Sequence, residues 1–388
     1  MTFAPVLNCP SVPLSNGLQI PILGLGTSHN GGYSHDAVVY ALTECGVRHI
    51  DTAKRYGCEE ELGKAIRESG LVRSDLWLTN KLWPGDYGYK AAKKACLDSC
   101  SLMGAECFDL YLMHWPDSWQ PGCSNREMRA ETWRALEELY KEGVCRAIGV
   151  SNFLVHHLEQ LKEDCSVTPH VNQVEYHPFQ QPIHLMEYCR REGIVFEGYS
   201  PLAKGQVLSN PTVLHIAEKH RRTPAQICIR WSIQNGVVTI PKSIKKKRIQ
   251  ENCQVFGFQL EEGDMATLGK LHDGRHVEYH PFQQPSEPME YCRQEGIAFQ
   301  GYCPLAKGQV LSNPTFIQVA QKYGRTPAQI CIRWSVQNGA ITIPKSTKKE
   351  RVVENCQVFG FQLEEEDMGA MIKLHDGRHV SWDPTNVE

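Results

Sequence analysis

Short apolar segments alternate with longer amphipathic segments between residues 22 and 241. The apolar segments have the length of strands, and the amphipathic segments repeat their apolar residues with a helical period. Eight strands are predicted, at residues 22–26, 49–52, 76–81, 108–114, 147–151, 171–177, 195–200 and 238–241. Seven of the helices between them are predicted at residues 34–45, 59–69, 89–103, 129–142, 154–162, 183–192 and 211–221.

This order of elements predicts an α/β fold, and specifically a (β/α)8 TIM barrel. Strands that alternate with helices form parallel βα units, and strands that are apolar throughout belong to a sheet covered on both faces. A doubly wound open sheet is the alternative, but residues 24–27 are Gly-Leu-Gly-Thr rather than the expected Gly-x-Gly-x-x-Gly. Residues 12–20 form a predicted hairpin on the Asn-Gly turn at 16–17, which is expected to plug the barrel floor.

A tandem repeat occupies the C-terminal part of the chain. Residues 175–277 recur without a gap as residues 278–380, and 77 of the 103 positions are identical. We expect a barrel over 1–277, a partial barrel with strands 7 and 8 and their helices over 278–380, and a tail over 381–388. The first copy is expected to close the barrel, because the second could do so only across a long inserted loop. A monomer is expected, with self-association through 278–380 as the alternative.

Composition and charge narrow the classes of partner. Hydrophobic residues make up 41% and charged residues 22% of the chain, and the net charge is −3 without a basic stripe, so no nucleic-acid partner is expected. No apolar run is long enough to span a bilayer, and the N-terminus lacks the pattern of a signal peptide, so we expect a cytoplasmic protein without a membrane partner. The sixteen cysteines are scattered, which favours reduced thiols, and no metal-ligand set is complete.

Ionisable side chains lie at the predicted C-terminal ends of successive strands. Asp51 ends the second strand, with Tyr56 shortly after it, Lys81 ends the third and His114 ends the fourth. Each has an ordinary structural explanation by itself: Asp51 as a helix cap, Lys81 as a snorkelling side chain, and His114 as a buried core histidine. Their joint placement predicts a single site at the barrel mouth, since active sites of this fold lie at that end.

The motifs around these residues resemble those of the aldo-keto reductase family. They are Asp-Thr-Ala at 51–53 with Tyr56, Asn-Lys-Leu-Trp at 80–83, His-Trp-Pro at 114–116, Gly-Val-Ser-Asn-Phe at 149–153 and Ile-Pro-Lys-Ser at 240–243. The resemblance covers residues 1–277 in order. It implies an oxidoreductase that reduces aldehydes and ketones to alcohols with NADPH, acting in reverse on CH–OH donors with NADP as acceptor. The implied catalytic residues are Asp51, Tyr56, Lys81 and His114.

The residue types suit this chemistry. Tyrosine keeps its proton at neutral pH, and a nearby cation stabilises the phenolate that forms when the proton is given up. Tyr56 is therefore the expected general acid, with Lys81 as the cation and Asp51 as the group that orients it. His114 is expected to hydrogen-bond the carbonyl oxygen of the substrate. The alternative hypothesis is a catalytically silent, NADPH-binding regulatory or structural protein on the same barrel.

The resemblance also implies a binding site for NADPH. Tyr199 would stack on the nicotinamide, and Arg248 would help to bind the 2′-phosphate of the adenosine. The expected cofactor-binding residues are Ser151, Asn152, Gln173, Tyr199, Ser200, Leu202, Lys242, Ser243, Arg248, Glu251 and Asn252. The second copy keeps several of these residues, at Tyr302, Lys345, Ser346, Arg351, Glu354 and Asn355, but has no counterparts of the four catalytic residues.

Tryptophans are expected to line the substrate pocket. Trp83, Trp115 and Trp119 are the candidates, whereas the tryptophan that many family members carry after Gly-Leu-Gly-Thr is absent here. The tail at 381–388 is short, and long tails close the pocket in steroid-specific members. These two features predict an open site for small aldehydes, dicarbonyls or sugar-derived carbonyls.

Overall fold

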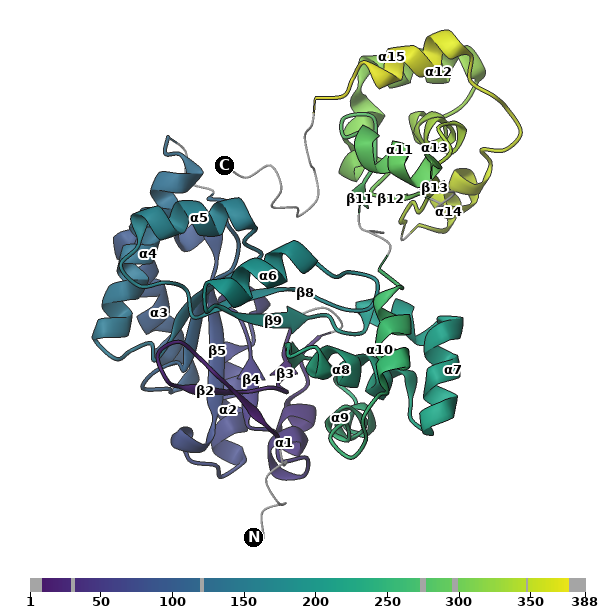
Figure 1. The fold of residues 1–388 in the computed structure, drawn as a ribbon. Helices are drawn as coiled ribbons and strands as arrows, with labels where there is room; N and C mark the ends of the chain where they lie inside the picture. The colour runs from purple at the N-terminus through teal and green to yellow at the C-terminus, as the bar shows by residue number, and fades with distance from the viewer. Residues whose placement is uncertain are drawn as a thin grey trace. The chain divides into compact units, whose positions relative to one another are not determined.

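A computed structural model describes residues 9–28, 32–118, 122–272, 277–294, 299–346 and 348–376. The described residues form two compact units, one ending at His272 and the other beginning at Val277. Figure 1 shows both, with the chain coloured from purple at the N-terminus to yellow at the C-terminus. We call residues 9–272 the barrel unit and residues 277–376 the appended unit. Trp119 and residues 381–388 lie outside the described residues.

Eight parallel strands form the sheet of the barrel unit, in sequential spatial order. They are β3 (Leu25–Gly26), β4 (His49–Asp51), β5 (Trp77–Leu82), β6 (Leu110–Met113), β7 (Ile148–Ser151), β8 (Val171–Glu175), β9 (Val195–Tyr199) and β10 (Val238–Ile240). Parallel bridges from Leu23 to Thr239 and from Gly26 to Lys242 join the first strand to the last. The predicted (β/α)8 barrel is thus confirmed, and the strand that completes it comes from the first copy of the repeat.

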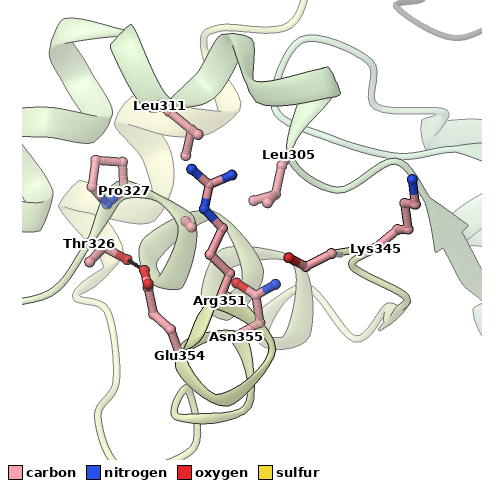
Figure 2. Close-up of a pocket in the computed structure, with 10 residues that line it drawn as sticks. Leu305, Leu311, Thr326, Pro327, Lys345, Arg351, Glu354 and Asn355 are labelled. Atoms are coloured by element: carbon pink, nitrogen blue, oxygen red, sulfur yellow. Dashed lines mark hydrogen bonds between the residues drawn. The ribbon is translucent and has the colours of Figure 1, made fainter. Parts of the chain in front are cut away.

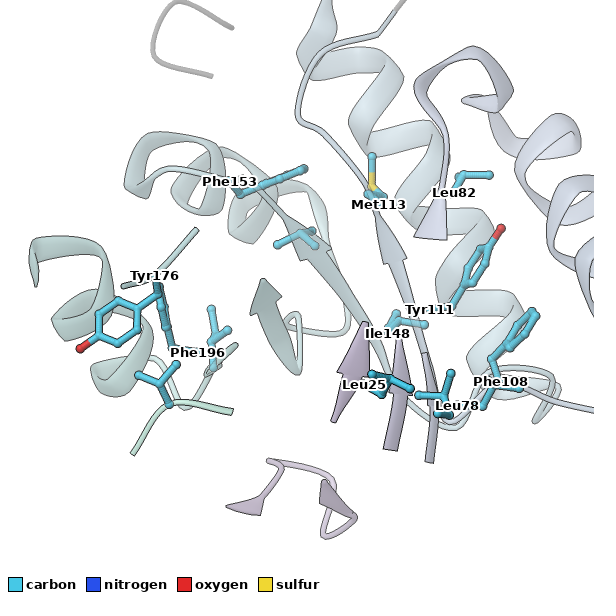
Figure 3. Packing of buried hydrophobic residues seen from close by; sticks show 14 of the residues in the cluster. Leu25, Leu78, Leu82, Phe108, Tyr111, Met113, Ile148, Phe153, Tyr176 and Phe196 are labelled. Atoms are coloured by element: carbon cyan, nitrogen blue, oxygen red, sulfur yellow. The ribbon is translucent and has the colours of Figure 1, made fainter. Parts of the chain in front are cut away.

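Helices surround the strands and bury their outer faces (Figure 1). They are α1 (His35–Thr43), α2 (Glu59–Glu68), α3 (Tyr89–Met103), α4 (Asn125–Lys141), α5 (Val155–Asp164), α6 (Ile183–Arg191), α7 (Pro211–His220), α8 (Pro224–Gln234), α9 (Lys246–Cys253) and α10 (Glu262–Gly269). Short 3-10 helices lie at Lys54–Tyr56, Arg73–Asp75, Pro84–Asp86 and Ala203–Ser209. Figure 3 shows part of the core, in which Phe108 stacks on Tyr111 at a ring-centroid distance of 5.6 Å. Burial of such apolar surface is the main stabilising contribution to the fold.

A hairpin of β1 (Ser11–Pro13) and β2 (Gln19–Pro21) closes the barrel floor, as the Asn-Gly turn predicts. Gly17 has a φ of 85°, which glycine adopts without strain. Leu14 and Ile20 are buried in one apolar cluster with the interior residues Leu110 and Val171. The hairpin therefore keeps water out of the end of the barrel opposite the strand C-termini.

The appended unit has an open, three-stranded parallel sheet. Its strands are β11 (Val277–Glu278), β12 (Gln300–Tyr302) and β13 (Ile341–Thr342). Its helices are α11 (Ser286–Gln294), α12 (Pro314–Tyr323), α13 (Pro327–Gln337), α14 (Lys349–Cys356) and α15 (Glu365–Ile372), with a 3-10 helix at Ala306–Ser312. Val277 belongs to the first copy of the repeat but pairs with Gly301 of the second, so the sheet of the appended unit begins before residue 278.

The sheet of the appended unit ends at an uncovered strand. Ile343 is 45% exposed, whereas its counterpart in the barrel, Ile240, is 4% exposed. The same isoleucine of the repeat is thus buried in the barrel and exposed in the appended unit. In the barrel, the first strand pairs with β10, whereas the described residues of the appended unit offer no strand to the free edge of β13. Inside the unit, Trp334 stacks on Tyr279 at 5.1 Å, much as Trp231 stacks on Tyr176 at 5.0 Å in the barrel.

Two further expectations can be compared with the described residues. No helix among them is long and apolar enough to cross a membrane. All sixteen cysteines carry free thiols, and the described part of the chain contains no cluster of His, Cys, Asp and Glu that could hold a metal ion.

Candidate active site

The four expected catalytic residues meet at the C-terminal end of the barrel strands. Asp51 is the last residue of β4, and Lys81 lies near the end of β5. The 3-10 helix at Lys54–Tyr56 follows β4 and carries Tyr56, while His114 comes directly after β6. Parallel strands end on the same side of a sheet, so side chains far apart in the sequence are brought together there.

Asp51 and Lys81 form a buried ion pair. Lys81 Nζ lies 2.5 Å from Asp51 Oδ1 and 2.6 Å from Oδ2, and it also donates a hydrogen bond to the carbonyl of Thr52 at 3.0 Å. Both side chains are almost fully buried, with exposures of 3% for Asp51 and 1% for Lys81. Burial by itself would lower the pKa of Lys81, but the charge of Asp51 reverses that effect and the pKa is raised. Lys81 is therefore held as a fixed cation.

Tyr56 lies between this cation and His114. The Lys81 Nζ atom is 5.6 Å from the centroid of the Tyr56 ring, and the Tyr56 and His114 rings meet edge-on at 5.9 Å. Burial raises the pKa of Tyr56, and Lys81 opposes this rise through its charge and a hydrogen bond to the phenol. The phenol thus keeps its proton at neutral pH, next to a cation that can stabilise the phenolate.

Several side chains predicted to bind the cofactor also form hydrogen bonds to the catalytic residues or to one another. Gln173 donates a hydrogen bond from Nε2 to Asp51 Oδ2 at 2.8 Å. Asn152 has a left-handed backbone, with a φ of 62°, and donates from Nδ2 to the carbonyl of His114 at 3.0 Å. Ser151 donates to the carbonyl of Gln173 at 2.9 Å, and the Tyr199 hydroxyl donates to Asn152 Oδ1 at 2.8 Å. These bonds connect the predicted nicotinamide side of the mouth to the ion pair.

The residues predicted to bind the adenosine phosphate lie around β10 and α9. Lys242 follows β10 and is half-buried, which lowers its pKa, and Ser243 accepts a hydrogen bond from the backbone of Lys245. The guanidinium of Arg248, on α9, forms no ion pair or hydrogen bond with the described residues. Glu251 accepts a hydrogen bond from the Thr223 hydroxyl at 2.6 Å, and Asn252 is 5% exposed. Ser200, with a φ of 53°, and the half-buried Leu202 lie between these groups and Tyr199 in sequence.

Two of the three predicted pocket tryptophans can be placed. The Trp83 ring meets His114 edge-on at 5.3 Å, and the Arg55 guanidinium lies 5.4 Å from its centroid. The Trp115 side chain is half-buried, and its carbonyl accepts a hydrogen bond from Tyr87 at 2.5 Å. Trp83 therefore flanks the site directly, and Trp119 lies outside the described residues.

A second titratable pair, which the sequence analysis missed, lies deeper in the barrel. His49 and Glu197 are fully buried, with His49 Nε2 3.6 Å from Glu197 Oε1. His49 Nδ1 lies 3.1 Å from the carbonyl oxygen of Pro21, which can only accept, so Nδ1 carries the proton. Burial and the charge of Asp51 raise the pKa of Glu197 to about 8, and burial lowers the pKa of His49 to about 4. The pair is therefore mainly uncharged at neutral pH.

The sequence contains one signal for this pair, which is a spacing of two residues from a predicted site residue on the same strand. His49 precedes Asp51 by two positions and Glu197 precedes Tyr199 by two, so each shares the interior face with a predicted site residue. Gly24 leaves room for the imidazole, because a Cβ atom there would lie 2.7 Å from the His49 ring.

The buried Glu197 carboxyl predicts a pH dependence of stability. The folded barrel keeps a proton on Glu197 up to a pH of about 8, whereas an unfolded glutamate loses it near its ordinary pKa, so stability falls as the pH rises between them. The lowered pKa of His49 makes stability fall as the pH drops, but only below the ordinary histidine pKa. Between about pH 6.5 and 8, stability therefore changes through Glu197 and not through His49. Across this window we expect the free energy of unfolding to drop by about 2 kcal/mol in the native chain.

Urea unfolding at several pH values checks this prediction in native and Glu197→Gln proteins. The amide cannot titrate, so the decline should disappear in Glu197→Gln and persist in the exposed control Glu187→Gln. A decline that is the same in all three proteins would assign the titration to another group.

Comparison with known proteins identifies the class to which this site belongs. The family model for the aldo/keto reductase family matches residues 22–273 and 275–376. The chain is 44% identical over 273 residues to the glyoxal reductase of Bacillus subtilis, covering 70% of this chain and 96% of that one. It is also 44% identical over 275 residues to the 9,11-endoperoxide prostaglandin H2 reductase of Trypanosoma cruzi, covering 70% and 93%. The chain belongs to the aldo/keto reductase family.

Solved structures agree with this assignment. An aldo/keto reductase from Brucella melitensis matches with a TM-score of 0.64 and 42% identity, covering 69% of this chain and all of that one. A variant of Gox0644 crystallised in complex with NADPH matches with a TM-score of 0.63 and 39% identity, covering 68% and 94%. This chain is therefore an oxidoreductase of a family that reduces carbonyl groups.

Proposed function

We propose that Tyr56 is the proton donor in the reduction of small, reactive carbonyl compounds by this chain. The observation that carries the proposal is the placement of the half-buried Tyr56 ring close to Lys81 of the Lys81–Asp51 ion pair and edge-on to His114. NADPH supplies the hydride when it is bound. Tyr56 gives its proton to the carbonyl oxygen, which becomes the alcohol, and Lys81 stabilises the phenolate that remains. His114 aligns the carbonyl oxygen by a hydrogen bond.

The residues around β10 and α9 fit the adenosine phosphate of NADPH. Arg248 offers a guanidinium without a protein partner among the described residues, and Lys242 and Ser243 supply a further cation and a hydroxyl nearby in sequence. Arginine binds phosphate through two parallel hydrogen bonds, so this group supports a preference for NADPH over NADH. At the other end of the cofactor site, Tyr199 offers its ring to the nicotinamide.

Small aldehydes and dicarbonyls are the substrates that the site supports best. Trp83 provides one aromatic wall beside His114, and the relative from Bacillus subtilis is named for glyoxal. We therefore choose glyoxal as the first substrate for testing.

Steady-state reduction of glyoxal by the full chain tests both the reaction and the cofactor preference. Consumption of NADPH upon addition of glyoxal is expected. In Arg248→Ala, the KM for NADPH should rise roughly 10- to 100-fold, which is the effect of losing a charge-assisted hydrogen bond, while the KM for NADH should change little. The exposed neighbour Lys247 provides the matched control, and Lys247→Ala should leave both KM values close to the native ones.

The results separate the enzyme from its alternative. Tight binding of NADPH without turnover on glyoxal or a panel of other aldehydes would favour the catalytically silent regulatory or structural protein. Equal effects of Arg248→Ala on NADPH and NADH would remove Arg248 from the phosphate site.

The remaining expectations concern the organisation of the chain. We propose that residues 1–277 are the functional domain, that the protein is cytoplasmic, and that the monomer can associate with itself through residues 278–380. The exposure of Ile343 and of Phe359, at 45% and 72%, supports the last point, since exposed apolar surface of this kind favours association.

A further inference from the structure

The appended unit contains a pocket that the reaction does not use. Its volume is about 280 Å³, and Figure 2 shows how its side chains are arranged. The lining residues come from the 3-10 helix at Ala306–Ser312 and the residue before it, from α13 and α14, and from the loops before these two helices: Leu305, Leu311, Thr326, Pro327, Ala328, Lys345, Ser346, Arg351, Glu354 and Asn355. This volume is at the lower end of ligand-binding pockets, which indicates a ligand the size of one nucleotide rather than a dinucleotide.

Two cations, Lys345 and Arg351, line this pocket and have no side-chain partner among the described residues. Neither Arg351 nor Lys345 forms an ion pair or a side-chain hydrogen bond with the described residues. In Figure 2 the Arg351 side chain reaches toward Leu311 and Leu305. A guanidinium that forms no ion pair with the described residues is suited to a phosphate ester, and Lys345 adds a second cation to the lining of the same pocket.

The pocket also offers hydrogen-bonding groups of a different kind. The Asn355 side chain is 9% exposed, and its amide has no hydrogen-bond partner among the described residues. The Asn355 amide can therefore both donate a hydrogen bond to a ligand in this pocket and accept one from it. The Thr326 hydroxyl donates to Glu354 Oε1, which fixes the carboxylate as an acceptor (Figure 2).

The cationic and acceptor groups of the pocket together favour a ligand that has a phosphate at one end and a hydrogen-bond donor at the other. A simple anion would be repelled by Glu354, whereas an adenosine phosphate places its phosphate by Arg351 and its amino group within reach of a carboxylate or an amide oxygen. Leu305, Leu311 and Pro327 provide apolar surface for a flat base. The pocket therefore combines cationic, acceptor and apolar groups in the manner of a nucleotide site.

The repeat supports this reading of the pocket. All ten lining residues are identical to their counterparts 103 positions earlier, although 26 of the 103 repeated positions differ. Among those counterparts are Lys242, Ser243 and Arg248, the residues proposed to hold the adenosine phosphate in the barrel. Asp51, Tyr56, Lys81 and His114, in contrast, lie outside the repeated segment and have no second copy.

We propose that the appended unit is a second nucleotide-binding site, which takes the phosphorylated adenosine half of a nucleotide and performs no reaction on it. The choice of a ribose-phosphorylated adenosine as the ligand rests on the function proposed for the barrel. The full chain then binds two such groups, one in the barrel and one in the appended unit.

Calorimetric titration of the full chain with adenosine 2′,5′-bisphosphate tests the proposal, because this ligand lacks a nicotinamide. Two molecules are expected to bind per chain. Arg351→Ala should weaken one of the two sites at least about tenfold, and Arg248→Ala should weaken the other. Lys345→Ala gives a second variant of the appended site, and Lys349→Ala removes a cation from the same helix outside the pocket as the matched control.

Each result assigns the sites separately. A single site that is lost in Arg248→Ala would overturn the second site while leaving the barrel function intact. Two sites that both survive Arg351→Ala and Lys345→Ala would place the second one elsewhere and also overturn the proposal. Loss of a site in Arg351→Ala but not in Arg248→Ala would support the appended site and contradict the barrel assignment. Parallel titrations with adenosine 3′,5′-bisphosphate, adenosine 5′-monophosphate and inorganic phosphate identify which phosphate is recognised.

Discussion

Replacing Tyr56 by phenylalanine is expected to lower kcat/KM for carbonyl reduction by roughly 10²- to 10⁴-fold, the usual contribution of a positioned general acid. The change removes the hydroxyl and its proton but keeps the ring that meets His114 at 5.9 Å. Lys81 remains paired with Asp51, so the fold of the mouth should be preserved. Steady-state reduction of glyoxal measures the loss, and fluorescence titration with NADPH shows whether cofactor binding is retained.

The same substitution on an outer helix of the barrel, away from the site, is the control for this experiment. Tyr188 lies on α6, where its ring contacts Arg191 at 5.0 Å, and Tyr188→Phe should leave kcat/KM unchanged. Retention of most activity in Tyr56→Phe would mean that another group delivers the proton, and His114 would then be the nearest candidate.

Asp51→Asn is expected to destabilise the barrel by about 3–5 kcal/mol, which is the cost of leaving a buried charge without its partner. Lys81 is 1% exposed, and its other hydrogen bonds, to the carbonyl of Thr52 and to the Tyr56 phenol, cannot replace the charge of Asp51. Carbonyl reduction should fall as well, because Lys81 would lose either its proton or its position next to Tyr56. Hydrogen exchange of barrel peptides measures the stability of this unit separately from the appended unit.

A double variant distinguishes the cost of leaving one buried charge unpaired from the cost of removing both charges. Asp51→Asn combined with Lys81→Met removes both charges, so most of the lost stability should return while activity stays low. Asp98→Asn breaks the exposed ion pair of Asp98 with Lys94 and should barely change stability, as exposed pairs contribute little. An Asp51→Asn protein as stable as the native one would show that Lys81 is not held as a buried cation.

The two copies of the repeat illustrate how one sequence can have two structural outcomes. In the barrel, β10 pairs on one side with β9 and on the other with the segment around Leu23 and Gly26. In the appended unit, β12 is the one strand among the described residues that pairs with β13. A strand edge with exposed apolar residues is a site for further pairing, so the appended unit carries the part of the chain most prone to association.

The order of strands and helices could be predicted because it depends on local patterns. The helix predicted at residues 89–103 has those bounds in the structure, and the Asn-Gly turn formed the expected hairpin. The first strand is the main difference: 22–26 was predicted, but only Leu25–Gly26 forms a regular strand. Its remaining residues bond to the last strand through isolated contacts such as Gly24 N to the Thr239 carbonyl at 2.9 Å.

The sequence predicted which residues form the candidate site, but not the contacts between them or their protonation states. Polar residues at strand ends and the family motifs indicated Asp51, Tyr56, Lys81 and His114. The hydrogen bond from Gln173 to Asp51 joins residues 122 positions apart, and no local pattern could reveal it. The neutral state of Glu197 also depends on burial and on a neighbouring charge, which exist only in the folded barrel.

The sequence by itself thus determined the kinds of element, their order, the repeat and the residue types at each strand end. These follow from side-chain periodicity and local backbone preferences, which act over a few residues. Only the tertiary structure decided which copy completes the barrel, which carboxyl stays protonated, and which of two identical isoleucines is buried. Ile240 and Ile343 have the same local sequence, but a partner strand is present for one of them and not for the other.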